Sequence, residues 1–219
     1  MIRIEEYVSE NGESPFKRWF DDLASQAAAI VTVAIGRLAD GNTSNVKPVG
    51  EGAAELRIDS EAGYRVYFGW DGKVLVILPG GGTGDSRAIS KRRCGAGATT
   101  RPASPAGEHD ALPLTKDFRD TVQARAARDP AFREAMFQEA MQALLQGDVD
   151  AGRAALRAYI NATIGFEKLG AALGRPQKSL MRMFGPGGNP TAENLLGVIG
   201  VLQAETGVHL EVRAVSDAA

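Results

Sequence analysis

The stretch that decides the fold of the C-terminal part of the chain is Gly165–Gly185, GFEKLGAALGRPQKSLMRMFG. Apolar residues recur at helical spacing on both sides of Gly174-Arg175-Pro176, which predicts two short helices joined by a tight turn. A glycine can end a helix in the left-handed conformation, and a proline is favoured at the first position of the next helix. The stretch therefore predicts a helix-turn-helix, a motif whose second helix enters the major groove of DNA.

The predicted second helix carries its polar residues on the face away from its leucine. These residues are Gln177, Lys178, Ser179 and Arg182. Within the whole stretch one acid, Glu167, is outnumbered by Lys168, Arg175, Lys178 and Arg182. Basic residues in this arrangement neutralise DNA phosphates. An ordinary helical hairpin with a solvated basic face fits the same pattern, because short helix pairs are common.

Composition bounds the class of protein. The chain has 219 residues, of which 44% are hydrophobic, and a formal net charge of −2. No apolar run approaches the roughly 20 residues that span a bilayer, and the first residues lack the order of a signal peptide, so we expect a cytoplasmic protein with no membrane partner. Cys94 is the single cysteine, which rules out an intramolecular disulfide. The sequence predicts neither a metal site nor a cofactor.

A change of composition divides the chain. Residues 94–111 are rich in glycine, alanine and proline and contain almost nothing to bury, so they predict a flexible linker. Residues 1–93 and 112–219 then form two halves, each of a plausible domain size.

The N-terminal half predicts a small α+β domain. After a first strand through Ile2 and Ile4, Ser14-Pro15 is a good start for a helix over 15–23, and Ser25 can cap a second helix that ends at Gly41. Beyond Asn45 apolar and polar residues alternate, and Asp71-Gly72 is typical of a hairpin turn before a strand over 73–78. This order predicts two helices packed on one antiparallel sheet.

The alternation also predicts a polar face on that sheet. If Leu56 and Val66 face the helices, then Arg57, Arg65 and Tyr67 project from the opposite face. Two arginines and a tyrosine on an open sheet can bind a phosphate backbone and stack on bases. The alternative is that each is a solvated residue paired with a nearby carboxylate, namely Glu55, Asp59 or Glu61.

These residues resemble the HigB-like branch of the RelE/ParE toxin superfamily. The resemblance covers most of residues 1–81 and rests on Phe16-Lys17-Arg18-Trp19, Gly50–Arg57 and Gly63–Phe68. Members of this superfamily are often ribosome-dependent mRNA endonucleases. The resemblance implies that Arg57 and Arg65 contact or stabilise the scissile phosphate, with Tyr64 or Tyr67 nearby.

The chain departs from that family after its last strand. The family usually continues with GGDK and a closing helix, whereas this chain has Gly80–Ile89 without the lysine, followed by Lys91-Arg92-Arg93. The half also lacks a histidine. RNA cleavage by the 2′-hydroxyl needs a proton acceptor, and a tyrosine would need a pKa far below its usual value near 10. We therefore expect weak or absent nuclease activity.

The C-terminal half predicts helices until its last residues. Helices are expected over 114–127, from Asp129-Pro130, from the cap Asp148, and from Asn189-Pro190. The tail alternates Val208, Leu210 and Val212, which predicts a strand. Because an isolated strand leaves its backbone groups without partners, we expect it to pair with the other half or with a second copy in a homodimer.

This half resembles a HigA-like antitoxin, a class of repressor-type transcriptional regulators. The resemblance spans roughly 112–214 and rests on Leu114–Phe118, Arg128–Arg133, Tyr159–Thr163, Lys178–Met183 and Gly188-Asn189-Pro190. It implies operator DNA as the partner. Gln177, Lys178 and Arg182 are the expected base readers, because lysine and arginine donate to guanine and glutamine pairs with adenine. Ser179 and Asn189 are the expected phosphate contacts. Lys168 and Arg175 are further candidates for phosphate contact, with a solvated surface charge as the alternative for each.

Together these resemblances imply a fused toxin–antitoxin protein. We expect mainly a repressor of its own operon, with the toxin-like half inactive or neutralised by contact within the chain. One alternative is an endoribonuclease that acts on mRNA at the ribosome, is held silent by its own antitoxin, and is released by proteolysis at the linker. Another is an interaction protein that titrates a free toxin or antitoxin.

Overall fold

The computed structural model describes residues 1–50, 52–60, 63–81 and 115–213. Over these residues the chain is a mixed α/β protein with a six-stranded sheet and eight helices. The strands are β1 (Arg3–Tyr7), β2 (Val46–Gly50), β3 (Ala53–Ile58), β4 (Tyr64–Asp71), β5 (Val74–Gly81) and β6 (Thr115–Asp117). The helices are α1 (Pro15–Asp22), α2 (Ser25–Ala39), α4 (Phe118–Arg128), α5 (Pro130–Leu145), α6 (Val149–Ala162), α7 (Gly165–Leu173), α8 (Gln177–Met183) and α9 (Ala192–Thr206).

The sheet is mixed, and the prediction of an antiparallel sheet was wrong in one pairing. The strand order is β2-β3-β4-β5-β1-β6. β1 runs parallel to β5, with Ile4 opposite Leu75, and the other neighbours are antiparallel. The path through α1 and α2 brings the chain back to the sheet at its far edge, so β1 ends up beside the last strand of the N-terminal half.

The C-terminal half supplies a strand to this sheet. β6 pairs antiparallel with β1, with Glu5 opposite Asp117. The predicted helix over 114–127 therefore begins only at Phe118, because 115–117 are extended against β1. Asp117 then caps α4 by accepting a hydrogen bond from the backbone N–H of Arg119 at 2.9 Å.

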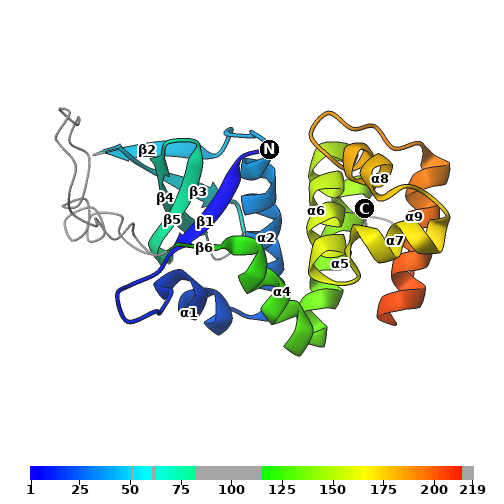
Figure 1. Cartoon of the computed structure of the whole chain (residues 1–219), viewed down its shortest axis with the longest axis horizontal. Coiled ribbons are helices and arrows are strands. Elements are labelled where there is room, and N and C mark those ends of the chain that lie inside the picture. Colours follow the sequence, from blue (N-terminus) through cyan, green and yellow to red (C-terminus); the bar gives the residue numbers. More distant parts are fainter. Residues whose placement is uncertain (51, 61–62, 82–114, 214–219) are drawn as a thin grey trace, which may run out of the picture.

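The helices form layers on one side of the sheet (Figure 1). α2 lies between the sheet and the α5–α6 pair, and α7, α8 and α9 lie at the end of the molecule farthest from the sheet. This position explains why α2 is apolar on more than one face. Ala28, Val31 and Ile35 are buried, while Ile30 and Val33 are half-buried.

One hydrophobic cluster runs through both halves. It includes Phe16 and Phe68 from the N-terminal half and Phe132 and Leu156 from the C-terminal half. Burial of such side chains is the main favourable term in folding. The two halves therefore share a core over the described residues.

A buried arginine reinforces this junction. The guanidinium of Arg125 donates to the carbonyl oxygens of Phe20 and Leu23, the latter at 2.6 Å, which satisfies the last turn of α1. It also lies 5.4 Å from the ring centre of Phe20 and 5.2 Å from that of Phe132, within cation–π range. Next to it the hydroxyl of Ser25 donates to Asp129 at 2.9 Å. Ser25 was predicted to cap α2, but Ala24 occupies the cap position and Ser25 is the first helical residue.

The predicted tail strand is absent from residues 208–213, which form no regular structure. α9 is capped at its C-terminal end by Gly207, whose φ is 68°, and the backbone N–H of Leu210 donates to the Gln203 side chain at 2.9 Å. The tail thus folds back on α9 and pairs with no strand of this chain among the described residues, while the homodimer stays a prediction. α9 itself begins at Ala192, capped by Thr191 rather than at Asn189-Pro190.

Two further predictions lie outside the described residues. These are the linker at 94–111 and the altered ending from residue 82 onward. Among the helices that the structure does describe, none has the length and apolar character to cross a membrane.

Candidate nucleic-acid interface

α7 and α8 form a tight two-helix unit. α7 is capped at its C-terminal end by Gly174, whose φ of 61° is left-handed, and three residues later α8 begins at Gln177. Pro176 occupies the cap of α8, one position earlier than predicted. The helices pack so closely that a Cβ on Gly170 would lie 2.7 Å from the carbonyl oxygen of Arg175. Such a short turn with glycine is typical of the helix-turn-helix motif.

The inner side of the unit is fixed by packing and by α6. Leu169, Leu180 and Phe184 are fully buried. From α6, the guanidinium of Arg157 donates to the carbonyl oxygen of Phe184 at 3.0 Å, and that of Arg153 donates to the carbonyl oxygen of Gly188 at 2.6 Å. These two arginines satisfy carbonyls at and beyond the C-terminal end of α8, which would otherwise be unpaired in a partly buried region.

The outer side of α8 presents all three predicted base readers. Gln177, Lys178 and Arg182 are exposed. Met181 shares this side and is 49% exposed, because residues 177, 178, 181 and 182 fall on one face of a helix with 3.6 residues per turn. Ser179 is half-buried and lies on the flank toward Met183 rather than with the outward residues.

The predicted phosphate contacts are less uniform. Arg175 lies exposed in the turn, and Asn189 lies exposed in the loop before α9. Lys168 instead forms an ion pair with Glu205 of α9. Arg175, Lys178 and Arg182 have no ion pair with any residue that the structure describes. The positive charge available to an external anion therefore gathers on α8 and the turn before it.

The sheet brings three of the four predicted catalytic residues together. Arg57 lies directly opposite Arg65, and Tyr67 lies directly opposite Glu55, all on the face away from the core residues Leu56 and Val66. The Glu55 carboxylate is buried and pairs with both arginines, at 2.6 Å from Nε of Arg57 and 3.8 Å from Nε of Arg65. Tyr67 is 3% exposed.

Tyr64 does not belong to that group. It is on the other face of the sheet, where its ring makes an edge contact with Trp19 at 6.3 Å between centroids. Alternation along β4 places Tyr64 with Val66 and Phe68, so of the two predicted tyrosines it is Tyr67 that shares the face of Arg57 and Arg65.

Sequence reasoning missed the residues that position α8. Arg153 and Arg157 were not considered, since arginine is rarely buried. Both residues lie on α6 and are buried. Their spacing of four residues in an alanine-rich helix was the available signal, because such a pair shares one face. Met181 was not considered for the outward face, because only the polar residues of the predicted helix were assigned to it.

Comparisons with known proteins give one informative result. No family model matches the chain, and no solved structure matches it. An uncharacterized protein of Haemophilus influenzae is 44% identical over 68 residues, which are 31% of this chain and 69% of that protein. At that identity and coverage of the relative, the chain belongs to the same family as this Haemophilus influenzae protein.

Proposed function

We propose that this protein is a sequence-specific DNA-binding repressor that reads its operator through the α7–α8 helix-turn-helix. The observation that carries the proposal is the outer side of α8, where Lys178 and Arg182 are exposed and have no ion pair among the described residues. Charges that are already paired would have to break an ion pair before they could neutralise a phosphate. Those on α8 are free to do so.

The two-helix unit is also built rigidly enough to read bases. A base contact requires a side chain to reach a groove edge in one register, which a loosely held helix cannot provide. Leu180 and Phe184 are fully buried, and Arg157 holds the carbonyl at the end of α8. In this proposal Gln177, Lys178 and Arg182 contact base edges, while Arg175 and Asn189 contact the phosphates.

The wider assignment follows from the resemblances of the two halves. We propose a fused toxin–antitoxin protein in which the toxin-like half is inactive and serves as a regulatory module. Fusion keeps the halves at high effective concentration. The shared core and the Arg125 contacts to α1 support a permanent association of the halves. A dimer on a two-fold operator is part of the proposal.

Nuclease activity draws less support. Arg57 and Arg65 share the Glu55 carboxylate, which reduces the positive charge that they offer to a phosphorane, and Tyr64 lies on the opposite face. A ribosome-programmed mRNA cleavage assay decides this point. We expect no cleavage above background, and cuts that disappear in Arg57→Ala would overturn the assignment of an inactive half.

The proposal is tested by a mobility-shift titration on the DNA upstream of the protein's own gene, with random duplex as competitor. We expect Arg182→Ala to weaken specific binding about 10-fold or more, because a base contact by arginine is worth about 1–3 kcal/mol. Arg175→Ala is expected to weaken specific and random binding alike and to lower the slope of affinity against salt by about 1.

Arg18→Ala is the matched control. The Arg18 side chain is 69% exposed on α1 and pairs with Glu13. The substitution therefore removes one surface arginine far from α8. Its DNA affinity should equal that of the wild type. If the folded wild type shows no preference for its upstream DNA over random duplex, the repressor function is wrong and an interaction protein becomes the better explanation.

A further inference from the structure

The C-terminal end of α8 is held in place by side chains from another helix. α8 has seven residues, and an isolated helix of that length is not stable in water. Its position therefore depends on contacts with the rest of the protein. From α6, Arg157 donates to the carbonyl oxygen of Phe184, and Arg153 donates to that of Gly188. These two arginines differ in the carboxylate that orients each of them.

Arg153 is oriented from within its own helix. Its Nη2 donates to Oδ1 of Asp150 at 2.8 Å, three residues earlier on α6, and the Asp150 side chain is 85% exposed. Water solvates such a carboxylate, so an ion pair with it contributes little to stability. The contact of Arg153 with Gly188 therefore involves no residue of the N-terminal half.

Arg157 is oriented by the N-terminal half. Its Nη2 donates to Oδ1 of Asp40, the residue that follows α2, while its Nη1 donates to Phe184. Both side chains of the ion pair are largely buried, so each charge depends on the other for compensation. Oδ2 of Asp40 has no hydrogen bond to any residue that the structure describes. The Asp40 carboxylate therefore pairs with Arg157 alone among the described residues and fixes the direction of its guanidinium group.

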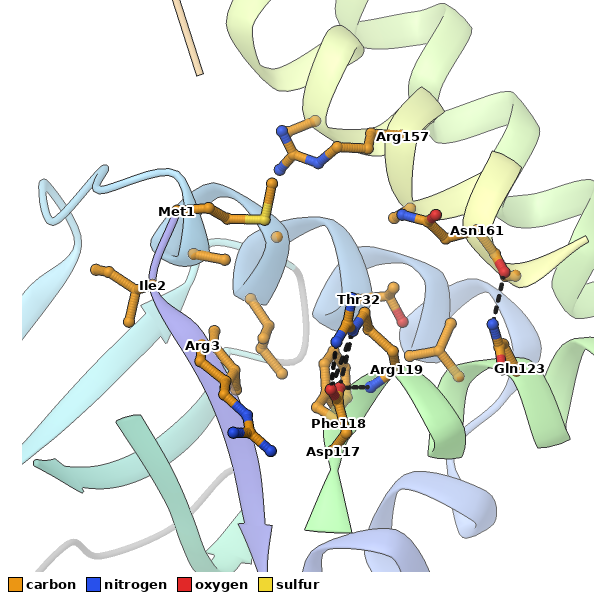
Figure 2. A pocket seen from close by; sticks show the side chains of 18 of the residues that line it. Met1, Ile2, Arg3, Thr32, Asp117, Phe118, Arg119, Gln123, Arg157 and Asn161 are labelled. Atoms are coloured by element: carbon orange, nitrogen blue, oxygen red, sulfur yellow. Dashed lines mark hydrogen bonds and ion pairs between the residues drawn. The ribbon is translucent and has the colours of Figure 1, made fainter. Parts of the chain in front are cut away.

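Close packing alone does not hold Arg157 in this orientation. Arg157 borders a cavity of about 400 Å³ that lies where the two halves meet. Figure 2 shows its side chain reaching from α6 toward Met1 at one side of this cavity. A guanidinium group with space beside it can adopt other rotamers, and without a counter-charge it is better solvated in such a space than in the core. The contact with Phe184 therefore depends on the Asp40 carboxylate.

A change at Phe184 reaches the residues that are expected to touch DNA. The segment after α8 lies against its last turn, because a Cβ on Gly188 would overlap the carbonyl oxygen of Met183. The segment and the turn therefore move together. The turn carries Arg182, an expected base reader, and the segment leads to Asn189, an expected phosphate contact. The contact at Phe184 thus affects where both side chains lie.

We propose that Asp40 is a positioning residue for DNA reading, because through Arg157 it fixes the C-terminal end of α8. The part of this proposal that concerns DNA rests on the proposed function. The N-terminal half then belongs to the DNA-reading unit without contributing a base contact. Loss of the Asp40 carboxylate lowers the preference for the operator and leaves binding to random DNA in place, since Lys178 and Arg182 keep the charge that neutralises phosphates.

The first experiment measures the end of α8 without DNA, by ¹⁵N relaxation of the full-length protein at the amides of Arg182, Phe184 and Gly188. It is made where circular dichroism shows each variant to be folded, so it reports on the native state. In the wild type these amides should have order parameters of about 0.85, and in Asp40→Asn they should fall below about 0.6 or show millisecond exchange. Unchanged relaxation in Asp40→Asn overturns the proposal.

Two further variants separate positioning from stability. Asp150→Asn removes the exposed acid beside Arg153 and should leave the relaxation unchanged. An effect equal to that of Asp40→Asn would contradict the role of the buried pair. Asp40→Leu combined with Arg157→Met removes both charges, so no unpaired charge stays in the core and the chain should fold even where Asp40→Asn does not. Methionine cannot donate to Phe184, so the end of α8 should still be mobile, and wild-type relaxation in this double variant overturns the proposal.

The second experiment titrates the upstream DNA and a random duplex across a salt series. Asp40→Asn should weaken specific binding about 5-fold or more, and should change binding to the random duplex by less than about 2-fold with the same slope against salt. A loss of folded protein would weaken both affinities alike. If both do weaken alike, or if neither changes while the relaxation does, the part of the proposal that concerns DNA is overturned. If the wild type never selects its upstream DNA, the repressor function fails while relaxation still decides whether Asp40 fixes α8.

Discussion

Arg157 and Asp40 form a buried ion pair that joins α6 to the C-terminal end of α2. Nη2 of Arg157 lies 2.5 Å from Oδ1 of Asp40, and the side chains are 8% and 11% exposed. Through Nη1 the same guanidinium donates to the carbonyl oxygen of Phe184. The Arg157 side chain, on α6, therefore connects the N-terminal half with the C-terminal end of α8.

Asp40→Asn should destabilise the protein by about 3 kcal/mol, because removing one partner leaves a buried charge without compensation. Urea unfolding followed by circular dichroism measures this. Glu211→Gln is the control: it breaks the pair of Glu211 with Arg213, whose side chains are 78% and 83% exposed, and should change stability by less than about 1 kcal/mol. Equal effects would show that the Arg157 pair is not effectively buried.

Gly170→Ala should lower the melting temperature and weaken DNA binding, because the new Cβ meets the backbone of the turn at 2.7 Å. Gly200→Ala in α9 is the matched change, since a Cβ added there would have no heavy atom within 4 Å beyond its own helix backbone and chain neighbours. There alanine should raise stability by about 0.5–1 kcal/mol through its higher helix propensity. A tolerated Gly170→Ala with wild-type DNA affinity would contradict the tight α7–α8 contact.

The lowered pKa of Asp129 predicts that the protein loses folding stability in acid. Burial raises the pKa of its carboxyl, but hydrogen bonds from the Phe132 N–H, from Ser25 and from Arg125 outweigh burial and hold the pKa below its ordinary 3.8. The folded state therefore favours the ionised form, so the stabilisation is complete above pH 3.8 and is lost as pH falls through the lower folded pKa.

Asp129→Ala should cost about 1–2 kcal/mol at pH 7, because it also removes the cap of α5. The difference from the wild type should shrink below pH 3.8 in urea titrations at several pH values. Asp22→Ala, an exposed position at the end of α1, should show neither the cost nor this pH dependence.

The raised pKa of Glu6 predicts the opposite trend, a loss of folding stability as pH rises. Burial raises the pKa of this carboxyl above its ordinary 4.5, and the hydrogen bond from Ser14 offsets that only in part. The folded protein then holds the proton more tightly than the unfolded chain, so stability falls as pH rises from 4.5 through the raised folded pKa.

Glu6→Gln keeps an acceptor for Ser14 and cannot ionise, so it should raise the melting temperature at pH 7 and lose that advantage below pH 4.5. Calorimetric melting at both pH values checks this, with the exposed Glu10→Gln as control. A variant that is less stable at pH 7 would mean that the ionised carboxylate is stabilising.

Local signals in the sequence predicted local structure well. Ser14, Asp129 and Asp148 each cap the helix expected from them, accepting from a backbone N–H three residues on. Alternation along 55–68 correctly placed Arg57 and Arg65 on the face opposite Leu56 and Val66. It did not predict that Glu55 and Tyr67, on the same face as the arginines, are buried. Caps and periodicity depend on a few neighbouring residues, so one sequence is enough to find them.

Long-range pairing was beyond such signals. β6 has three residues and forms only because β1 lies beside it, and no propensity marks so short a strand. The same applies to the parallel pairing of β1 with β5 and to the buried guanidinium groups of Arg125, Arg153 and Arg157. Each depends on a partner distant in the chain, and the tail at 208–213 shows the converse, an alternating pattern that finds no partner strand among the described residues.

The pairing of β6 with β1 has a consequence for a chain cut between residues 94 and 111. The later fragment would still carry the outermost strand of the earlier fragment's sheet and the arginine that completes its first helix. The two pieces would migrate as a single particle in a sizing column and separate only in denaturant. Cleavage of the chain is thus not enough to release the N-terminal half, because the half would have to unfold before it could dissociate.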